Sequence, residues 1–317
     1  MSLRIFLQDA MSPLNTSNLF DVSGKVVLVT GGSRGIGKMI ATGFVSNGAK
    51  VYISSRSAKD CEATAAELNT IGPGKCIPIP ADIQKLSEVE RLVKELSEKE
   101  KALHVLVNNA GATWGETVDD YPDAAFTKVL TLNLQRVFTL TQKCLPLLRA
   151  GAESGGVQGS VYRDPARIIN IGSIEGLAVP AHETYAYSAS KAGLHHLSRS
   201  LAGRLGVEGI TSNTIACGSS LFIPSNIRVH LPYGIYVFLS NVAGPFESKM
   251  MAHTLETLGE VIKARIPLRR IGTPEDVAGT ALFLSSRAGA FVNGATITLD
   301  GGSLVNIDGL STPSAKL

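Results

Sequence analysis

The sequence predicts an α/β fold, a single domain built on a doubly wound parallel sheet with helices on both faces. From Lys25 onward, short runs of β-branched residues alternate with longer amphipathic stretches, and the short runs read as strands buried on both faces. A glycine-rich segment directly follows the first run. Such alternation implies right-handed βαβ units. We therefore expect one domain over 21–303, a leader over 1–20 and a C-terminal tail over 304–317.

The expected elements can be placed from the apolar pattern. Three amphipathic stretches predict helices over Lys59–Asn69, Ser87–Lys101 and Phe126–Arg149. Residues 150–164 are rich in Gly and Ser, which predicts a loop. The clearest expected strands are Lys25–Thr30, Lys50–Ser54, Leu103–Val107, Arg167–Ile171 and Ile210–Ile215.

Composition excludes several classes of protein. Hydrophobic residues make up 44% and charged residues 18%, which is typical of a compact globular chain. The 30 Lys and Arg and 27 Asp and Glu form no basic block, so we expect no nucleic-acid partner, and no apolar run is long enough to span a membrane. The four cysteines and the His195-His196 pair lack the spacing of a metal site, so we expect no metal and a reducing compartment.

A glycine-rich loop follows the first expected strand and precedes a helical pattern. It reads Thr30-Gly-Gly-Ser-Arg-Gly-Ile-Gly37. A dinucleotide pyrophosphate binds backbone amides at a helix N-terminus, where glycine permits the close approach. The loop therefore predicts a Rossmann-type cofactor site, with an ordinary glycine-rich turn as the alternative. The candidate contacts are Gly31, Ser33, Arg34, Gly35, Ile36 and Gly37.

The end of the second strand indicates which nicotinamide cofactor binds. An acidic residue there would hydrogen-bond the adenosine ribose and repel a 2′-phosphate. The sequence instead reads Ser54-Ser55-Arg56, and Arg34 lies in the glycine loop. Two arginines suit a phosphate, so the sequence favours NADPH. The alternative is that both arginines are only solvated surface residues.

The strongest catalytic signal combines Ser173 with Tyr187 and Lys191. Tyr187 and Lys191 are four residues apart and share one face of a predicted helix, while Ser173 follows a predicted strand. The ammonium is expected to lower the pKa of the phenol, which would make Tyr187 a usable acid near neutral pH. Tyr185 has Ala189 at the same offset and cannot play this part.

These motifs together resemble the short-chain dehydrogenase/reductase family over about 21–218 and again over 245–303. The resemblance implies that Tyr187 donates a proton to the carbonyl oxygen and that Ser173 binds and polarises that oxygen. It implies that Lys191 holds the nicotinamide ribose and that Asn133, within the third expected helix, positions a water relay. Further residues follow in the family's order, namely Asp82, Ile83, Asn109, Ala110 and Gly111 at the cofactor and the closing Asp300-Gly301-Gly302.

Within the family, three segments look most like 3-oxoacyl-carrier-protein reductases of the rhamnolipid-synthesis type. They are Gly32–Met39, Asn109–Gly115 and Leu145–Arg149. The resemblance implies an NADPH-dependent reductase of a small-molecule carbonyl, with a 3-oxoacyl thioester as substrate, and a homo-oligomer, either a dimer or a tetramer. The alternatives are a secondary-metabolite ketone as substrate, or a dinucleotide-binding protein without turnover.

Two segments lie outside this pattern. Residues 219–244 are hydrophobic and aromatic without helical or alternating period, which predicts an insertion, either a substrate lid or the product of a retained intron. Removing it would join Gly218 to Pro245 and restore the family pattern. The last three residues, Ala315-Lys316-Leu317, resemble a Ser-Lys-Leu peroxisomal signal, so we expect a peroxisomal protein, with the cytoplasm as alternative.

Overall fold

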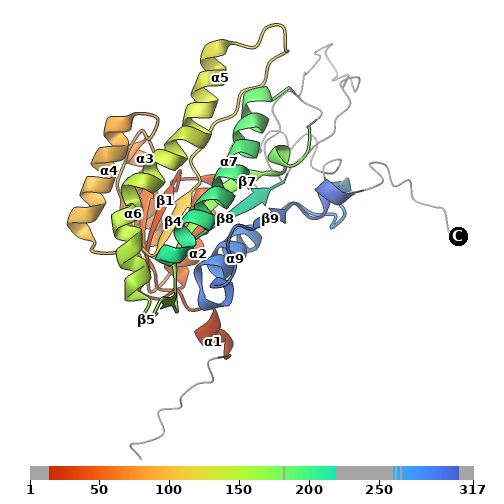
Figure 1. Ribbon diagram of the computed structural model, residues 1–317. Coiled ribbons are helices and arrows are strands. Elements are labelled where there is room, and N and C mark those ends of the chain that lie inside the picture. Colours follow the sequence, from red (N-terminus) through yellow and green to blue (C-terminus); the bar gives the residue numbers. More distant parts are fainter. Residues whose placement is uncertain (1–13, 181–182, 219–259, 261–262, 265, 307–317) are drawn as a thin grey trace, which may run out of the picture.

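The computed structural model describes residues 14–180, 183–218, 260, 263–264 and 266–306 (Figure 1). Its centre is a seven-stranded sheet in which every pair of neighbouring strands is parallel. The order across the sheet is β3-β2-β1-β4-β7-β8-β9, which confirms the predicted doubly wound fold. The strands are β1 (Val26–Thr30), β2 (Lys50–Ser54), β3 (Lys75–Pro78), β4 (Val105–Asn108), β7 (Ala166–Ser173), β8 (Ile210–Cys217) and β9 (Thr296–Leu299).

The strand order reverses beside β1. Leu28 of β1 is paired with Tyr52 of β2 on one side and with Leu106 of β4 on the other. In doubly wound sheets, ligands bind beyond the carboxyl ends of the strands at such a reversal. A bound ligand is therefore expected at the segments that follow β1, β4 and the neighbouring β7.

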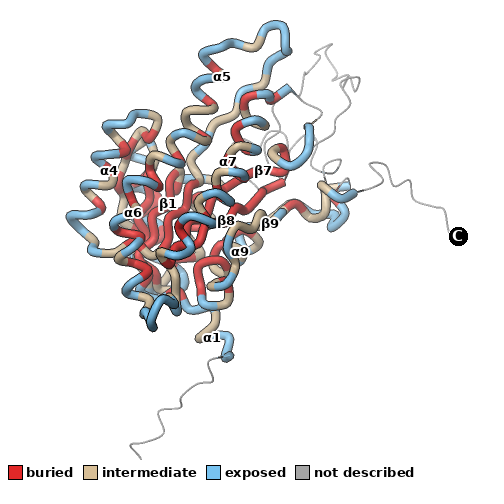
Figure 2. Tube along the Cα trace, in the orientation of Figure 1, coloured by how far each residue is buried: buried red, intermediate tan, exposed pale blue. Residues whose placement is uncertain are grey.

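Helices cover both faces of the sheet and enclose two apolar cores. Figure 2 shows that the strands between them are largely buried. Alternate residues of β1 divide between them, since Val27 and Val29 face one core and Leu28 faces the other. The first core lies against α2 (Gly35–Ser46), α3 (Ala58–Leu68) and α9 (Pro274–Ser285). The second lies against α4 (Leu86–Lys99), α6 (Arg136–Ser154) and α7 (Tyr185–Leu205).

The helix expected over Phe126–Arg149 differs in detail from the prediction. It begins at α5 (Asp123–Leu130), continues as one π-helical turn over Thr131–Gln135, and then becomes α6. A π turn places one additional residue in the helix and is often found at functional sites. Asn133 lies in this turn, and its side-chain amide forms hydrogen bonds to Ala112, which is outside the helix.

The prediction of a loop over residues 150–164 is wrong in part. Its first residues continue α6 to Ser154, and the remainder contains a short antiparallel hairpin, β5 (Val157–Gln158) and β6 (Val161–Tyr162). Gly156 and Gly159 have φ of 91° and 63°, values at which side chains are strained, so this chain reversal depends on glycine.

The described end of the leader contains the four-residue helix α1 (Thr16–Leu19), capped by Asn15. The rest of the leader, the predicted insertion 219–244 and the C-terminal tripeptide lie outside the described residues. No helix in the described part is long and apolar enough to cross a membrane.

Candidate functional site

The predicted site residues lie along one edge of the sheet, where β1, β4 and β7 end (Figure 1). The glycine loop joins β1 to α2, the Asn109–Gly111 segment follows β4, and Ser173 is the last residue of β7. Tyr187 and Lys191 lie in the first turns of α7. The fold therefore brings together groups that are as much as about 160 residues apart in the sequence.

The glycine loop is held close to the end of β2. The amides of Gly31 and Gly32 donate to the carbonyl oxygen of Ser54 at 2.7 and 3.3 Å, and the Thr64 hydroxyl donates to the carbonyl of Ser33 at 2.9 Å. Gly31 and Gly35 have φ of 65° and 52°. Only glycine adopts these values without strain, so the turn into α2 requires it at both positions.

Gly37 is fixed by close packing. A Cβ atom there would lie 2.3 Å from the carbonyl oxygen of Gly31 and 2.4 Å from Nδ2 of Asn109. The first turn of α2 consequently lies against the loop, and Arg34 at its N-cap gives it no side-chain cap. The N-terminal amides of such a helix suit a phosphate.

Thr30, which sequence reasoning did not select, connects the two cofactor segments. Its Oγ1 accepts from the amides of Asn109 at 3.0 Å and Ala110 at 3.1 Å, and donates to the carbonyl of Val107 at 3.2 Å. In return, Nδ2 of Asn109 donates to the Thr30 carbonyl at 2.8 Å. A threonine at the end of an apolar strand carried no separate signal in the sequence.

The two arginines expected at the 2′-phosphate are both exposed, and neither forms an ion pair with another described residue. They lie on neighbouring segments, since the Ser33 hydroxyl donates to the Ser55 hydroxyl at 2.9 Å, and each of these serines precedes one arginine. Both guanidinium groups, of Arg34 and Arg56, therefore remain available to an anion.

Asp82 and Ile83 lie beyond β3. Asp82 is half-buried, and its Oδ1 accepts from the amide of Gln84 at 3.3 Å, while Ile83 is buried in the second core. These contacts place them in the turn before α4.

Asn133 bridges the segment after β4 and the helix that carries Tyr187. Its Oδ1 accepts from the amide of Ala112 at 2.8 Å, and its Nδ2 donates to the Ala112 carbonyl at 2.8 Å and to Oγ of Ser190 at 3.0 Å. The Ser190 hydroxyl in turn donates to the Tyr187 carbonyl at 2.7 Å. A Cβ on Gly111 would lie 3.1 Å from Oδ1 of Asn133, so Gly111 is part of the same junction.

Ser173, Tyr187 and Lys191 meet at the end of β7. The Ser173 side chain lies close enough to Tyr187 to lower the pKa of the phenol. The ammonium of Lys191 lies 5.5 Å from the centre of the Tyr187 ring and donates to the carbonyl of Ile171 at 2.7 Å. Lys191 is 5% exposed, and burial lowers its pKa to about 8.

The expected lowering of the Tyr187 pKa by Lys191 is wrong for this structure. Burial raises the pKa of Tyr187 above its ordinary value, the Glu175 carboxylate raises it further, and the Ser173 side chain lowers it. The reason is geometric, because Lys191 lies over the face of the ring and its ammonium is bonded to Ile171. The phenol is therefore held in its protonated form.

Glu175 was also missed from the sequence. It lies in the short helix η2 (Ile174–Gly176) directly after Ser173, and it is 9% exposed. A charged residue just after a buried strand could have been noticed, because carboxylates are seldom buried without a specific role.

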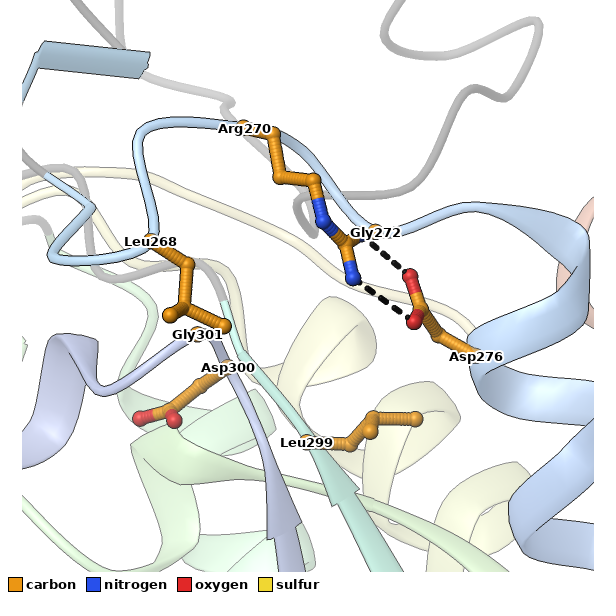
Figure 3. A pocket seen from close by; sticks show the side chains of 7 residues that line it. All are labelled: Leu268, Arg270, Gly272, Asp276, Leu299, Asp300 and Gly301. Atoms are coloured by element: carbon orange, nitrogen blue, oxygen red, sulfur yellow. Dashed lines mark hydrogen bonds and ion pairs between the residues drawn. The ribbon is translucent and has the colours of Figure 1, made fainter.

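A small cavity of about 70 Å³ lies beyond the end of β9 (Figure 3). Arg270 and Asp276 form a two-pronged ion pair at its side, with N–O distances of 2.5 and 2.9 Å. Asp300 borders the cavity and accepts from the amides of Gly302 and Leu304 at 2.9 and 2.6 Å. The closing Asp300-Gly301-Gly302 segment therefore anchors the chain at the sheet edge. The charged side chains that border the cavity already have hydrogen-bond partners.

The two adjacent histidines behave as packing and surface residues. His195 is 1% exposed, whereas His196 is exposed and lies 3.5 Å from Nη2 of Arg199. No group of three or more potential metal ligands occurs in the part of the chain that the structure describes.

Comparison with known proteins gives consistent matches. The family profile described as "short chain dehydrogenase" matches residues 25–221, and a second, described as "Enoyl-(Acyl carrier protein) reductase", matches residues 232–303. The rhamnolipids biosynthesis 3-oxoacyl-(acyl-carrier-protein) reductase of Pseudomonas aeruginosa is 40% identical over 283 residues, covering 89% of this chain and 97% of the relative. The L-rhamnose-1-dehydrogenase of Scheffersomyces stipitis is 33% identical over 90% of this chain and 98% of its own length.

The structural comparison agrees. The Pseudomonas aeruginosa RhlG/NADP active-site complex superposes with a TM-score of 0.76 at 39% identity, covering 90% of this chain and 98% of that one. The match extends over almost the whole length of the solved structure, so the similarity concerns the complete domain.

Proposed function

The chain belongs to the short chain dehydrogenase family, and we propose that it is an NADPH-dependent reductase that converts a ketone to an alcohol at Ser173, Tyr187 and Lys191. The observation that carries the proposal is the junction of these side chains at the carboxyl edge of the sheet. Ser173 acts on the pKa of Tyr187, and the buried Lys191 lies over the ring.

Each group has a part that its surroundings support. Tyr187, held protonated, would donate a proton to the carbonyl oxygen as that oxygen gains charge. Ser173 would hold the same oxygen through its hydroxyl, and Lys191 would bind the nicotinamide ribose. Asn133 would order a water at the π turn, where its own side chain is already fixed by Ala112 and Ser190. The bound nicotinamide supplies the hydride.

NADP is proposed as the cofactor because the solved relative at 39% identity is an NADP complex and because this chain offers Arg34 in the glycine loop and Arg56 just after β2. The pyrophosphate would lie at the N-terminus of α2, beside Gly31 and Gly37. Arg56→Asp is expected to weaken NADPH binding by at least about tenfold and to spare NADH, because it puts a negative charge beside the 2′-phosphate. Titration of both cofactors by fluorescence measures this, and an unchanged preference would leave Arg56 as a surface residue.

A 3-oxoacyl thioester is the proposed substrate. The names of two relatives, at 40% and 32% identity, include 3-oxoacyl-(acyl-carrier-protein) reductase. Apolar side chains also lie exposed on the segments that lead away from Ser173 and Asn109, as an acyl chain requires. These are Trp114 at 42%, Leu177 at 42% and Val179 at 96% exposure.

The test is NADPH oxidation with 3-oxoacyl thioesters of increasing chain length, and with a sugar lactone and a cyclic ketone for comparison. Turnover that rises with chain length supports the thioester. Activity confined to the sugar would instead favour a reaction like that of the L-rhamnose-1-dehydrogenase relative.

Tyr187→Phe should lower turnover at least about 100-fold. Tyr185→Phe is the matched control, since Tyr185 is exposed and bonds Glu183. Near-normal turnover of Tyr187→Phe would contradict the assignment.

We further propose that residues 219–244 are an insertion that interrupts an otherwise complete reductase. Deletion of this segment, joining Gly218 to Pro245, should give a chain at least as soluble and as active as the full one, and transcripts without the corresponding codons should exist. Loss of activity on deletion would make the segment a working lid. An inactive full chain that binds NADPH and gains turnover on deletion would identify a binding protein blocked by its insertion.

The peroxisome is proposed as the location, on the basis of Ala315-Lys316-Leu317 alone. A full-length chain tagged at its N-terminus should accumulate in peroxisomes, and a diffuse cytosolic signal would contradict the proposal.

A homo-oligomer is proposed because two large apolar side chains are exposed, Phe138 on α6 and Phe291 in the segment before β9.

A further inference from the structure

Glu175 is a buried acidic residue placed between the two parts of the site. Its backbone amide donates to Oγ of Ser173 at 3.2 Å, so the turn after β7 is closed on the serine itself. The Ser173 side chain also acts on Tyr187, because it lowers the pKa of the phenol. Glu175 therefore holds a serine that influences the proposed proton donor.

The carboxylate of Glu175 reaches the start of α7. Its Oε2 accepts from Oγ1 of Thr184 at 2.7 Å and from Oγ of Ser188 at 3.4 Å. Thr184 is the N-cap residue of α7, yet its hydroxyl forms no cap with the helix backbone. Ser188 is the next residue after Tyr187. Glu175 therefore fastens the Ser173 turn to the first turn of the Tyr187 helix.

The charged and titratable groups that face Tyr187 come from three elements. Glu175 lies in η2, Lys191 lies one turn along α7, and Cys217 ends β8. Burial raises the pKa of the Cys217 thiol to about 12, so it is neutral near pH 7. Glu175 is thus the anionic group that acts on the phenol, and it acts on Lys191 as well.

We propose that Glu175 is a positioning residue that fastens Ser173 to the helix bearing Tyr187 and keeps a negative charge beside the phenol and the ammonium. This inference rests on the proposed function, because it assigns Glu175 an effect on the proton donor of that reaction.

The charge has a defined consequence. A carboxylate beside a phenol disfavours the phenolate and so raises the pKa of Tyr187, and beside Lys191 it stabilises the ammonium. Two hydroxyl donors reduce the cost of keeping the carboxylate buried. Glutamine at this position could accept the same bonds without the charge, so the two contributions can be separated by substitution.

The test compares Glu175→Gln, Glu175→Asp and Glu183→Gln in the full chain. Glu183→Gln is the matched control, since Glu183 is an exposed carboxylate in the segment leading into the same helix. The first readout is the rate of 3-hydroxyacyl thioester oxidation with NADP+ from neutral to alkaline pH, in which the rising limb follows ionisation of Tyr187. The second is the 13C resonance of ring-labelled tyrosine with NADP+ bound, assigned with Tyr187→Phe.

In Glu175→Gln, both the kinetic limb and the Tyr187 resonance should move to lower pH by about one unit, a tenfold change in the ionised fraction. Glu175→Asp keeps the charge and should stay close to the unmodified chain, and Glu183→Gln should not move at all. If Glu175→Gln titrates like the unmodified chain, or if Glu175→Asp moves equally far, the carboxylate has no electrostatic effect and the proposal fails.

The two hypotheses fail in different ways. A shifted Tyr187 resonance together with full turnover of Tyr187→Phe would uphold the effect of Glu175 and overturn the proposed reaction. Loss of turnover in Tyr187→Phe together with an unmoved resonance in Glu175→Gln would do the opposite. If Glu175→Gln does not fold, Glu175→Asp combined with Thr184→Val, which removes the stronger bond and keeps the charge, should leave the limb in place. A limb that moves there would show that the bonds, and not the charge, set the titration.

Discussion

Replacing Thr30 by valine tests how the cofactor edge is held together. The change keeps the shape of the side chain but removes a hydroxyl that accepts two backbone amides, of Asn109 and Ala110, and donates to the Val107 carbonyl. Thr30 is 1% exposed, and the two amides are half-buried. At about 1 kcal/mol for each bond, the free energy of unfolding should fall by about 3 kcal/mol.

The matched control is Thr214→Val on β8. Thr214 is fully buried, and its hydroxyl has no hydrogen-bond partner among the residues described, so the same chemical change should be neutral or stabilising by up to about 1 kcal/mol. Urea unfolding followed by circular dichroism measures both variants, with the shift of the midpoint interpreted at an unchanged slope. If the two variants differ by less than about 1 kcal/mol, the Thr30 bonds do not stabilise this edge and the reasoning is wrong.

Three further outcomes are expected. Gly172→Ala should lower the free energy of unfolding by about 2 kcal/mol or more, because the new Cβ would lie 2.3 Å from Nε2 of His195. Gly279→Ala, in a helix with open space around the residue, should raise the free energy of unfolding by about 0.5–1 kcal/mol, and thermal unfolding compares the two variants. Burial lowers the pKa of His195 to about 4, so between about pH 6.5 and 4 the unfolded chain binds a proton that the folded chain does not. The free energy of unfolding should therefore fall as the pH drops through this range. His195→Leu should remove this pH dependence, as measured by urea unfolding at each pH. The hydrogen bond from Arg270 lowers the pKa of Asp276 to about 2, so its stabilising effect should be lost between about pH 4 and 2, and Asp276→Asn should flatten acid unfolding there.

The strands and the site segments could be predicted because their signals are local. A strand buried on both faces is mostly apolar along its length, as β1 and the centre of β2 are, and the apolar and β-branched residues of β7 outnumber its polar ones. A glycine loop must stand between a strand and a helix to bind a phosphate, so its place in the chain fixed its place in the fold. The same reasoning located Ser173 at the end of β7 and Lys191 on α7.

The remaining features depend on contacts between distant parts of the chain. The π turn around Asn133 exists because that amide binds Ala112 and Ser190, which lie about 21 and 57 residues away. The hairpin β5–β6 uses pairs of residues too short to give an alternating pattern. The direction in which the Lys191 ammonium points follows from the carbonyl of Ile171, which helical spacing alone does not reveal.

The electrostatics of the site hold Tyr187 in its protonated form. Burial and Glu175 both raise the pKa of Tyr187, and Lys191, turned toward Ile171, does not offset them. A phenol in these surroundings is protonated near neutral pH, which is the form that can donate a proton. Lys191, whose pKa lies near 8, is the group of the site that titrates closest to physiological pH. Tyr187 and Lys191 are therefore both expected to contribute to the pH dependence of activity.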